Sequence, residues 1–510
     1  MKKLLYKNSI VGVIQVLLTT ILTFVGIHFL ISKLGVEEYG VFALISVIGN
    51  LNIFANLGLN FSLIKFISEQ GDSVESNWDI IISIVILSII IIPLSILFML
   101  FGHFIMTNIL NVPTNYIENT KQLYNFLLLS NILMLIGQLF SSVFDAIQKI
   151  YITNFLQMIY STLYWVLIIV VLALGYSLGE IGICIFISTL VWFILTLYFF
   201  VRLWGRLKSK GIFSQKYRLL RKHFNYGSKI YLSGTLNFFY EPLTKLLISN
   251  FLSINYVGYF DIALKIRTIF LSFISKILYP LYPYIANLND KVKISNLVND
   301  IQKKLLYAVI IITAIVFGCT YQLIQIWIGQ NVNIISISVI SIITFFMLNI
   351  TGMPNYQYLM THQVSKTLVF QFANVIINIT TFMLLYKLLG YYAILVSFNL
   401  SMLLTFVLTL YYQRKYLNSF MFDSLHYIYR LALLFVVLFS IAILSRQIDN
   451  IVILIINPIL IIVSSLIIFR YFNYFTVQDI EKYISGYGRI ENIVKKLLIK
   501  NRKILIENEN

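Results

Sequence analysis

Charged residues are scarce in this chain of 510 residues: 38 are Lys or Arg and 20 are Asp or Glu, which together make 11% of the sequence. A soluble domain normally carries about 25% charged residues. This shortage excludes an ordinary cytosolic enzyme, a nucleic-acid-binding protein and a disordered scaffold. Cysteine is also rare, and Cys184 and Cys319 lie far apart within apolar runs. We interpret both as small core residues rather than as a disulfide or a metal site.

The motifs that mark common enzymes are absent as well. The sequence contains no G-x-x-x-x-G-K-[ST] string, no zinc-ligand spacing and no nucleophile elbow, so ATP binding in the usual loop is not expected. No N-terminal targeting peptide stands out, because the first apolar run, Ser9–Ile31, is longer than a signal-peptide core and lacks an Ala-x-Ala cleavage site. We therefore expect neither catalysis nor a bound metal or cofactor.

Apolar residues, in contrast, are abundant, at 59% of the chain, with 15% aromatic residues. A bilayer-spanning helix needs about 20 mostly apolar residues, so this supply is enough for a dozen or more spans. The composition predicts an all-α, polytopic membrane protein. Apolar runs bounded by polar or Gly/Pro/Asn-rich segments predict fourteen transmembrane helices, at 9–32, 41–66, 80–106, 122–148, 152–175, 179–203, 227–250, 256–287, 304–327, 334–360, 366–387, 391–413, 426–446 and 451–473.

The placement of Lys and Arg predicts the orientation of these helices. If the N-terminus lies inside, thirty of the 38 basic residues fall on the inner side and four fall within spans. The outer side then holds only Lys33, Lys121, Lys387 and Arg446. Cytoplasmic loops are enriched in Lys and Arg, so the pattern predicts an even number of spans with both termini in the cytoplasm.

One substantial inner loop divides the chain into parts. We predict an N-terminal lobe of six helices (1–204), a basic cytoplasmic linker (205–226), a C-terminal lobe of six helices (227–415), a C-terminal helix pair (416–475) and a basic amphipathic tail (476–510). Nine basic residues between Arg202 and Lys229 either fix the topology or bind anionic lipids. The tail is expected to lie on the inner membrane surface.

An internal repeat relates the two predicted lobes. Residues 30–44 read LISKLGVEEYGVFAL and residues 247–264 read LISNFLSINYVGYFDIAL. Leu30-Ile31-Ser32 aligns with Leu247-Ile248-Ser249, and Tyr39-Gly40 aligns with Val257-Gly258 after a small insertion. Each segment joins the first two helices of its half in an outer turn, so the lobes have the same orientation. Parallel repeats of this kind predict pseudo-symmetric lobes with a substrate path between them.

Six ionisable residues fall inside predicted spans, where charge is costly and marks functional sites. They are Glu241 and Lys245 in the seventh helix and Asp261, Lys265, Arg267 and Lys276 in the eighth. Two acid-then-base pairs at i,i+4 spacing, Glu241/Lys245 and Asp261/Lys265, are expected on one face of each helix, near the membrane midplane. Alternatively, these groups pair only as buried salt bridges or extend to the interface.

Weaker candidates lie in the first half of the chain. His28 lies near the outer end of the first helix, whereas Lys65 and the Asp145/Lys149 pair lie near inner ends and are also explained as interfacial charges. Asn56 belongs to a group of amides, with Gln15, that either contact sugar hydroxyls or form interhelical hydrogen bonds. The candidates in this half are His28, Asn56, Lys65, Asp145 and Lys149.

Three strings carry a resemblance to a known family: residues 34–40 (LGVEEYG), residues 56–59 (NLGL) and residues 257–263 (VGYFDIA). The chain resembles the polysaccharide-exporter (Wzx-type) flippases of the multidrug/oligosaccharidyl-lipid/polysaccharide exporter superfamily, which is MATE-like, over its whole length and helix count. The resemblance implies a flippase that moves undecaprenyl-diphosphate-linked oligosaccharide units across the bacterial inner membrane for O-antigen, capsule or exopolysaccharide synthesis. It also implies polysaccharide polymerase and chain-length machinery as partners.

For such a substrate the charged residues gain a role. A lipid diphosphate needs a hydrated, cationic cavity, in which Lys245, Lys265, Arg267 and Lys276 would supply positive charge, Arg267 by bidentate contact. Glu241 and Asp261 would balance the charge or bind a coupling cation. The energy source would be a H⁺ or Na⁺ gradient, the substrate gradient or both, and the mechanism is expected to be rocker-type alternating access between the lobes.

Two other classes compete with this interpretation. Within the same superfamily, the chain could be a lipid II flippase or a cation-coupled multidrug exporter. A membrane polysaccharide polymerase or ligase is the alternative from a different class. Such enzymes carry a large outer loop with catalytic residues, and every predicted outer loop in this chain is short.

Overall fold

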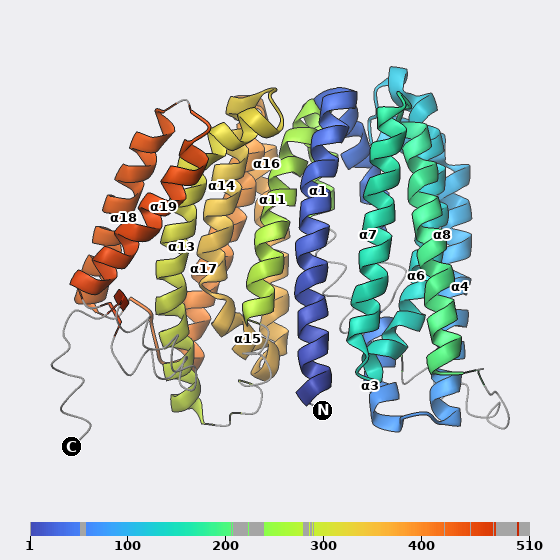
Figure 1. Cartoon of the computed structure of the whole chain (residues 1–510), viewed down its shortest axis with the longest axis horizontal. Helices are drawn as coiled ribbons and strands as arrows, with labels where there is room; N and C mark the ends of the chain where they lie inside the picture. The colour runs from blue at the N-terminus through green and yellow to red at the C-terminus, as the bar shows by residue number, and fades with distance from the viewer. Residues whose placement is uncertain are drawn as a thin grey trace. The chain divides into compact units, whose positions relative to one another are not determined.

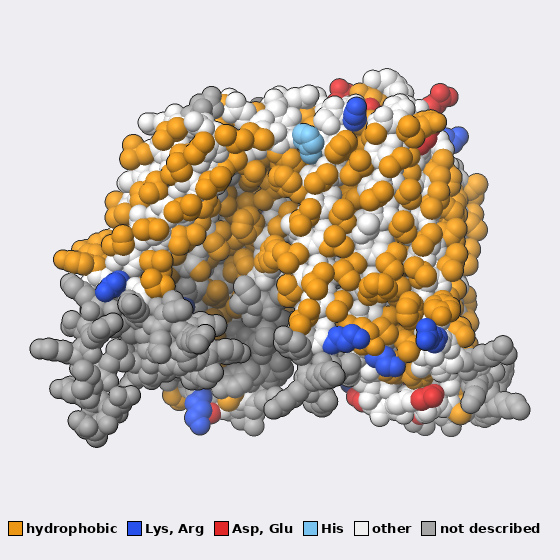
Figure 2. Space-filling model, viewed as in Figure 1, with side chains coloured by type: hydrophobic (Ala, Val, Ile, Leu, Met, Phe, Trp, Pro, Cys, Tyr) orange, Lys and Arg blue, Asp and Glu red, His pale blue; other side chains and the backbone are white. Residues whose placement is uncertain are grey.

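The computed structural model confirms an all-α, multi-pass membrane protein (Figure 1). No strand occurs among the described residues. Eleven helices of this part of the chain are long and apolar enough to cross a membrane. Hydrophobic side chains cover the sides of the helices in the view of Figure 2, and charged side chains lie toward the helix ends. The structure describes residues 2–51, 58–205, 207, 223, 239–278, 285, 288, 290–422, 424–448, 450–472, 474–475 and 497–498.

The chain divides into two compact units, of which the first comprises Met1–Phe273 and Gln371–Ser397. Within it, α6 contacts α4, α7 and α8, and α1 contacts α7. Its elements are α1 (Lys2–Ile45), η1 (Ser46–Leu51), α3 (Leu59–Gln70), α4 (Val74–Leu100), α5 (Gly102–Phe104), η2 (Ile105–Ile109), η3 (Thr114–Tyr116), α6 (Ile117–Ala146), α7 (Ile150–Ala173), α8 (Leu178–Leu203), α10 (Glu241–Phe251) and most of α11 (Ile254–Leu278).

The second unit comprises Ile274–Phe370 and Phe398–Asn510. In it, α13 contacts α14, α18 and α19, and α18 contacts α19. The helices are α13 (Lys291–Trp327), α14 (Val332–Ile350), α15 (Met353–His362), α18 (Leu425–Arg446) and α19 (Ile453–Tyr471), while α16 (Val364–Leu389) and α17 (Tyr392–Leu417) are each divided between the units. The lobes expected at 1–204 and 227–415 stay a prediction.

Several helices begin where the sequence supplies a cap. The Ser73 side chain accepts a hydrogen bond from the Ser76 backbone N–H at the start of α4. At the start of α8, Ser177 and Glu180 form a capping box, which satisfies two backbone N–H groups that the helix itself leaves without partners. At the start of α13, the Asp290 side chain accepts hydrogen bonds from the Val292 and Lys293 backbone N–H groups. These local signals account for where the three helices begin.

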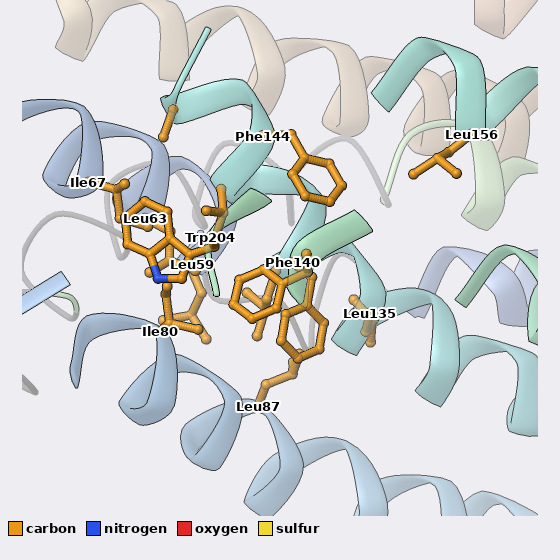
Figure 3. Close-up of a cluster of buried hydrophobic side chains, with 14 of the residues drawn as sticks. Leu59, Leu63, Ile67, Ile80, Leu87, Leu135, Phe140, Phe144, Leu156 and Trp204 are labelled. Carbon is orange, nitrogen blue, oxygen red and sulfur yellow. The ribbon is translucent and has the colours of Figure 1, made fainter. Parts of the chain in front are cut away.

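A buried hydrophobic cluster packs α3, α4, α6, α7 and α8 of the first unit together (Figure 3). The rings of Phe140 and Phe200 lie 4.7 Å apart between α6 and α8. At the end of α8, the indole N–H of Trp204 donates to Asn77 of α4 over 2.9 Å. The other members come from α3, α4, α6, α7 and α8 and include Leu59, Leu63, Ile67, Ile80, Leu87, Leu135, Phe144, Leu156 and Trp192.

Fourteen spans were predicted, and eleven helices of the described residues are long and apolar enough to be spans. Three predicted spans have no counterpart among these eleven. The continuous helix expected at 41–66 is wrong, because Gly58 has φ of 72° and α3 begins after it. Of the helix expected at 227–250, the structure describes only α10 and the turn before it. The helix expected at 256–287 is present as α11, but it carries four charged residues and therefore lacks a sufficiently apolar stretch.

Other predicted segments are shorter or fall outside the described residues. The helix expected at 334–360 divides into α14 and α15. Pro354 stands in the first turn of α15, where its missing N–H cannot continue the preceding helix. The linker at 205–226 and the tail at 476–510 lie almost wholly outside the described residues.

The internal repeat has a structural counterpart within the first unit. The helical stretch of α1 breaks at Gly35, which has φ of 79°, and α10 is followed by its C-terminal cap residue, Leu252. Both breaks stand five residues after the leucine that opens the repeat. The helical segments that follow the breaks then meet at equivalent glycines: a Cβ built on Gly40 lies 2.4 Å from the Ile254 carbonyl oxygen, and one built on Gly258 lies 3.5 Å from the Gly40 Cα.

This close crossing predicts a strong effect of a single methyl group. Gly40→Ala is expected to destabilise the protein by about 1–3 kcal/mol, because the added carbon overlaps backbone that cannot rotate away. The measurement is thermal unfolding of the purified protein in detergent. Gly102→Ala is the control, since the atoms nearest to its Cβ would belong to the Tyr124 side chain, at 3.1 Å or more, and not to backbone. Equal losses in the two variants would contradict the crossing.

Candidate functional site: a charged helix hairpin beside two cavities

Helices α10 and α11 form a hairpin whose charges pair across the two helices. Lys245 Nζ lies 2.5 Å from Asp261 Oδ1, and Arg267 pairs with Glu241. Partners stand at similar separations from the turn at Leu252, as expected for neighbouring antiparallel helices. The ion pairs among these residues therefore join the two helices, because the hairpin brings an opposite charge from the facing helix closer than the i,i+4 neighbour.

Asp261 is the centre of this arrangement. Its side chain is 4% exposed, and its second oxygen accepts a hydrogen bond of 2.6 Å from the Tyr39 hydroxyl. Tyr39 and Asp261 stand beside the crossing glycines, so the carboxylate joins both copies of the repeat. A buried carboxylate needs such partners to offset its lost hydration. The ion pairs Lys245–Asp261 and Arg267–Glu241 thus neutralise four of the six charged residues predicted for the site.

Lys265 differs from the paired residues. It is exposed and makes no hydrogen bond or ion pair with any described residue. It stands one helical turn beyond Asp261, about 6 Å along α11, and lines two separate cavities of the first unit. Lys276 also belongs to α11, but its side chain lies outside the described part of the structure. Of the predicted cations whose side chains the structure describes, Lys265 is thus the one that is available to a ligand in these cavities.

The first cavity, called the aromatic cavity below, has a volume of about 250 Å³. Tyr39 and Phe42 of α1 line it together with Tyr160, Tyr164 and Trp165 of α7. Polar groups are contributed by Ser130 and Asn131 of α6, by Thr189 of α8 and by Lys265. Apolar faces with a few convergent polar groups are typical of small-molecule sites.

The second cavity, called the hydroxyl cavity below, has a volume of about 190 Å³. Apart from two aliphatic side chains and Lys265, its wall consists of Gln15, Thr19, Thr20 and Thr23 of α1 with Thr268 and Ser272 of α11. Hydroxyl and amide groups around one ammonium group can hydrogen-bond and neutralise an oxyanion such as a phosphate. Gln15, expected either to contact sugar hydroxyls or to form an interhelical hydrogen bond, lines this cavity and donates to Thr19 of its own helix over 3.3 Å.

None of the weaker candidates that the structure describes is among the residues that line the two cavities. His28 is exposed, with its ring against Phe29, and Lys65 is exposed on α3. Asp145 accepts a hydrogen bond of 2.7 Å from Thr153. Neither Asp145 nor Lys149 is among the residues that line the two cavities. Asn56 lies outside the described residues.

A buried polar network escaped the prediction. His223 lies 2.8 Å from Ser62 Oγ through Nδ1 and 3.0 Å from Asp79 Oδ1 through Nε2, and both His223 and Asp79 are fully buried. Full burial leaves no room for a substrate, so the arrangement is structural. It attaches the end of the predicted linker to α3 and α4. The sequence contains two hints of this network: Asp79 lies near the start of an apolar helix, and His223 is a lone histidine in a basic loop.

Removal of the Asp79 carboxylate should lower the free energy of unfolding, because His223 would stay buried without this partner. Asp79→Ala is expected to destabilise the protein by about 1–3 kcal/mol, because His223 keeps its buried position without its acceptor. Asp72 is exposed, so Asp72→Ala serves as the matched control. Thermal unfolding in detergent compares the variants, and an unchanged midpoint for Asp79→Ala would refute the role of the network.

Comparisons with known proteins agree with this architecture. Residues 5–289 match the family of polysaccharide biosynthesis proteins. The lipid II flippase MurJ in an inward-closed conformation is 15% identical, with a TM-score of 0.69 over 90% of this chain and 98% of that one. No curated relative matches the chain.

Two further solved structures share the fold. An inward-facing multidrug resistance MATE family transporter of the MOP superfamily is 14% identical, with a TM-score of 0.65 over 80% of this chain and 98% of that one. A MOP superfamily transporter from Pyrococcus furiosus is 14% identical, with a TM-score of 0.60 over 82% of this chain and 96% of that one. The predicted resemblance is confirmed: the chain has the fold of these transporters, and it belongs to the family of polysaccharide biosynthesis proteins.

Proposed function

We propose that the chain is a flippase for undecaprenyl-diphosphate-linked oligosaccharide units. It works in the bacterial inner membrane, with both termini in the cytoplasm, and supplies units for O-antigen, capsule or exopolysaccharide synthesis. Family membership supports a role in polysaccharide synthesis, and the multi-pass fold supports transport rather than chemistry on the sugar. Anionic lipids, a polymerase and chain-length machinery are the proposed partners.

The position of Lys265 is the single observation that carries this proposal. It is an exposed cation within a helical hairpin, it has no ion-pair partner among the described residues, and it adjoins both a hydroxyl-lined and an aromatic cavity. A diphosphate linked to a sugar offers the matching chemistry, because its oxyanions suit the ammonium and hydroxyl groups. Lys265 therefore holds the diphosphate during translocation.

The paired charges receive a different role. Lys245 and Arg267 are engaged by carboxylates, so they set the shape and neutrality of the hairpin instead of meeting the substrate first. Glu241 is 34% exposed, whereas Asp261 is 4% exposed. Glu241 is thus the carboxylate that a coupling H⁺ or Na⁺ would reach from the solvent. We propose alternating access, coupled to such a gradient or to the substrate gradient.

Deletion of the gene in its native host tests the proposal. Loss of the flippase should abolish surface glycan and should cause completed lipid-linked units to accumulate in the inner leaflet, because synthesis continues while export stops. Extraction of the lipid-linked pool with mass spectrometry measures this accumulation. Normal surface glycan with an unchanged lipid pool would contradict the assignment.

A lipid II flippase is the second candidate, favoured by the coverage of the match to MurJ, which spans 98% of that chain. Lipid II also joins a polyprenyl diphosphate to a sugar, so the same lysine would serve it. The deletion experiment separates the two substrates. Accumulated peptidoglycan precursor with cell lysis would select lipid II, whereas accumulated repeat units in viable cells would select the proposed substrate.

A further inference from the structure

The aromatic cavity contains more recognition chemistry than a diphosphate requires. Tyr160 and Tyr164 stand at i,i+4 on one face of α7 with ring centroids 5.9 Å apart, and the Trp165 ring lies 5.0 Å from that of Tyr164. Tyr39 and Phe42 of α1 line the same cavity. Phosphate oxygens gain nothing from these aromatic faces, so the cavity is built for another part of the ligand.

The polar groups of the cavity are placed for a neutral, hydroxylated ligand. Asn131 donates its amide N–H to the Ile48 carbonyl over 3.1 Å, and its carboxamide oxygen has no hydrogen-bond partner among the described residues. The Tyr164 hydroxyl also has no such partner there. The Asn131 oxygen can accept a hydrogen bond, and the Tyr164 hydroxyl can donate or accept one. These groups, beside aromatic faces, suit a pyranose, whose C–H face packs on aromatic rings while its hydroxyls form hydrogen bonds.

The size of the cavity limits how much of the glycan enters it. Its volume of about 250 Å³ lies below the roughly 300–1,000 Å³ of sites for drug-sized ligands. One sugar ring is therefore accommodated, and a complete repeat unit is not. Because Lys265 lines this cavity too, the ring that enters must be the one attached directly to the phosphate that Lys265 holds.

We infer that the aromatic cavity is a subsite for the first sugar of the lipid-linked glycan, with Tyr164 as its stacking and hydrogen-bonding residue. This inference rests on the proposed function, since Lys265 provides the neighbouring diphosphate contact. It assigns recognition of the first sugar to the first structural unit alone. Sugars farther from the lipid lie outside this cavity and are not selected by it.

Two probes test the subsite on the full-length protein in detergent: farnesyl diphosphate, which carries no sugar, and farnesyl diphosphate linked to N-acetylglucosamine. Thermophoresis measures both dissociation constants. The wild-type protein should bind the sugar-bearing probe about five- to tenfold more tightly, which is the increment expected of an aromatic stacking contact. This ratio requires no variant, so it remains informative if a substitution disturbs folding.

The variants then locate the subsite. Tyr164→Ala should reduce the ratio to about one while binding of farnesyl diphosphate persists, and Tyr164→Phe should retain most of the ratio because its ring remains. Tyr198→Ala is the matched control, since Tyr198 is 56% exposed on α8. Equal wild-type affinity for the two probes, or an unchanged ratio in Tyr164→Ala, would overturn the subsite. Binding of neither probe would overturn the proposed function together with the subsite.

Discussion

Lys265→Glu is expected to reduce surface glycan to the level of the deletion strain, while the amount of protein in the membrane stays unchanged. The substitution replaces the cation that faces both cavities with a group that repels a diphosphate. Loss of a hydrogen bond to a charged group costs about 1.5–3 kcal/mol, or roughly 10- to 150-fold in affinity, and repulsion adds to this. Complementation of the deletion strain, with immunoblotting of the membrane fraction, measures both quantities.

Two matched variants sharpen this result. Lys265→Arg keeps the positive charge and should support most of the export. Lys387 is an exposed lysine near the end of α16 that lines neither cavity, so Lys387→Glu changes the net charge equally and should export normally. Full export by Lys265→Glu, or loss of export in both glutamate variants, would show that the position of Lys265 is not important.

Asp261→Ala is expected to produce the largest loss of stability, about 3–5 kcal/mol, because it leaves the Lys245 ammonium, whose side chain is only 12% exposed, without its carboxylate. The double variant Lys245→Leu/Asp261→Leu should recover much of this loss, since it removes both charges together. Thermal unfolding in detergent of Lys245→Leu, Asp261→Leu and the double variant, compared with the wild type, forms a mutant cycle. The cycle reports the coupling between the two side chains directly.

A more exposed ion pair provides the control for this cycle. Asp300 and Lys304 lie 2.8 Å apart at i,i+4 on α13, with side chains 27% and 23% exposed. Asp300→Ala should cost only about 0–1 kcal/mol, as is usual for pairs near the surface. Asp261→Ala with an effect as small as that of Asp300→Ala would mean that the hairpin does not depend on its central carboxylate.

Much of the fold could be predicted because apolar runs of sufficient length have few alternatives to membrane helices. The predictions were wrong where backbone geometry interrupts an apolar run. Gly58 breaks the helix expected at 41–66 through a positive φ, and α14 ends before Pro354. A hydropathy pattern does not distinguish such breaks from a continuous helix.

The candidate site was predictable in composition but not in pairing. Charges within spans identified the hairpin, because only function or pairing offsets the cost of burying them. Which cation remains exposed depended on the facing helix, since Asp261 pairs with Lys245 rather than with Lys265. Tyr39 stands out in the sequence only within the repeat and the family string, yet it donates a hydrogen bond to Asp261. Such contacts between distant segments are properties of the tertiary structure.

The direct test of the central claim is translocation by the purified protein. Proteoliposomes would carry a fluorescent polyprenyl-diphosphate-linked disaccharide, and an added glycosidase would report the fraction of probe in the outer leaflet. We predict that vesicles with the wild-type chain expose the inner-leaflet probe within minutes and that vesicles with Lys265→Glu behave like protein-free vesicles. Wild-type vesicles no faster than protein-free vesicles, or equal rates for the wild type and Lys265→Glu, would contradict the account.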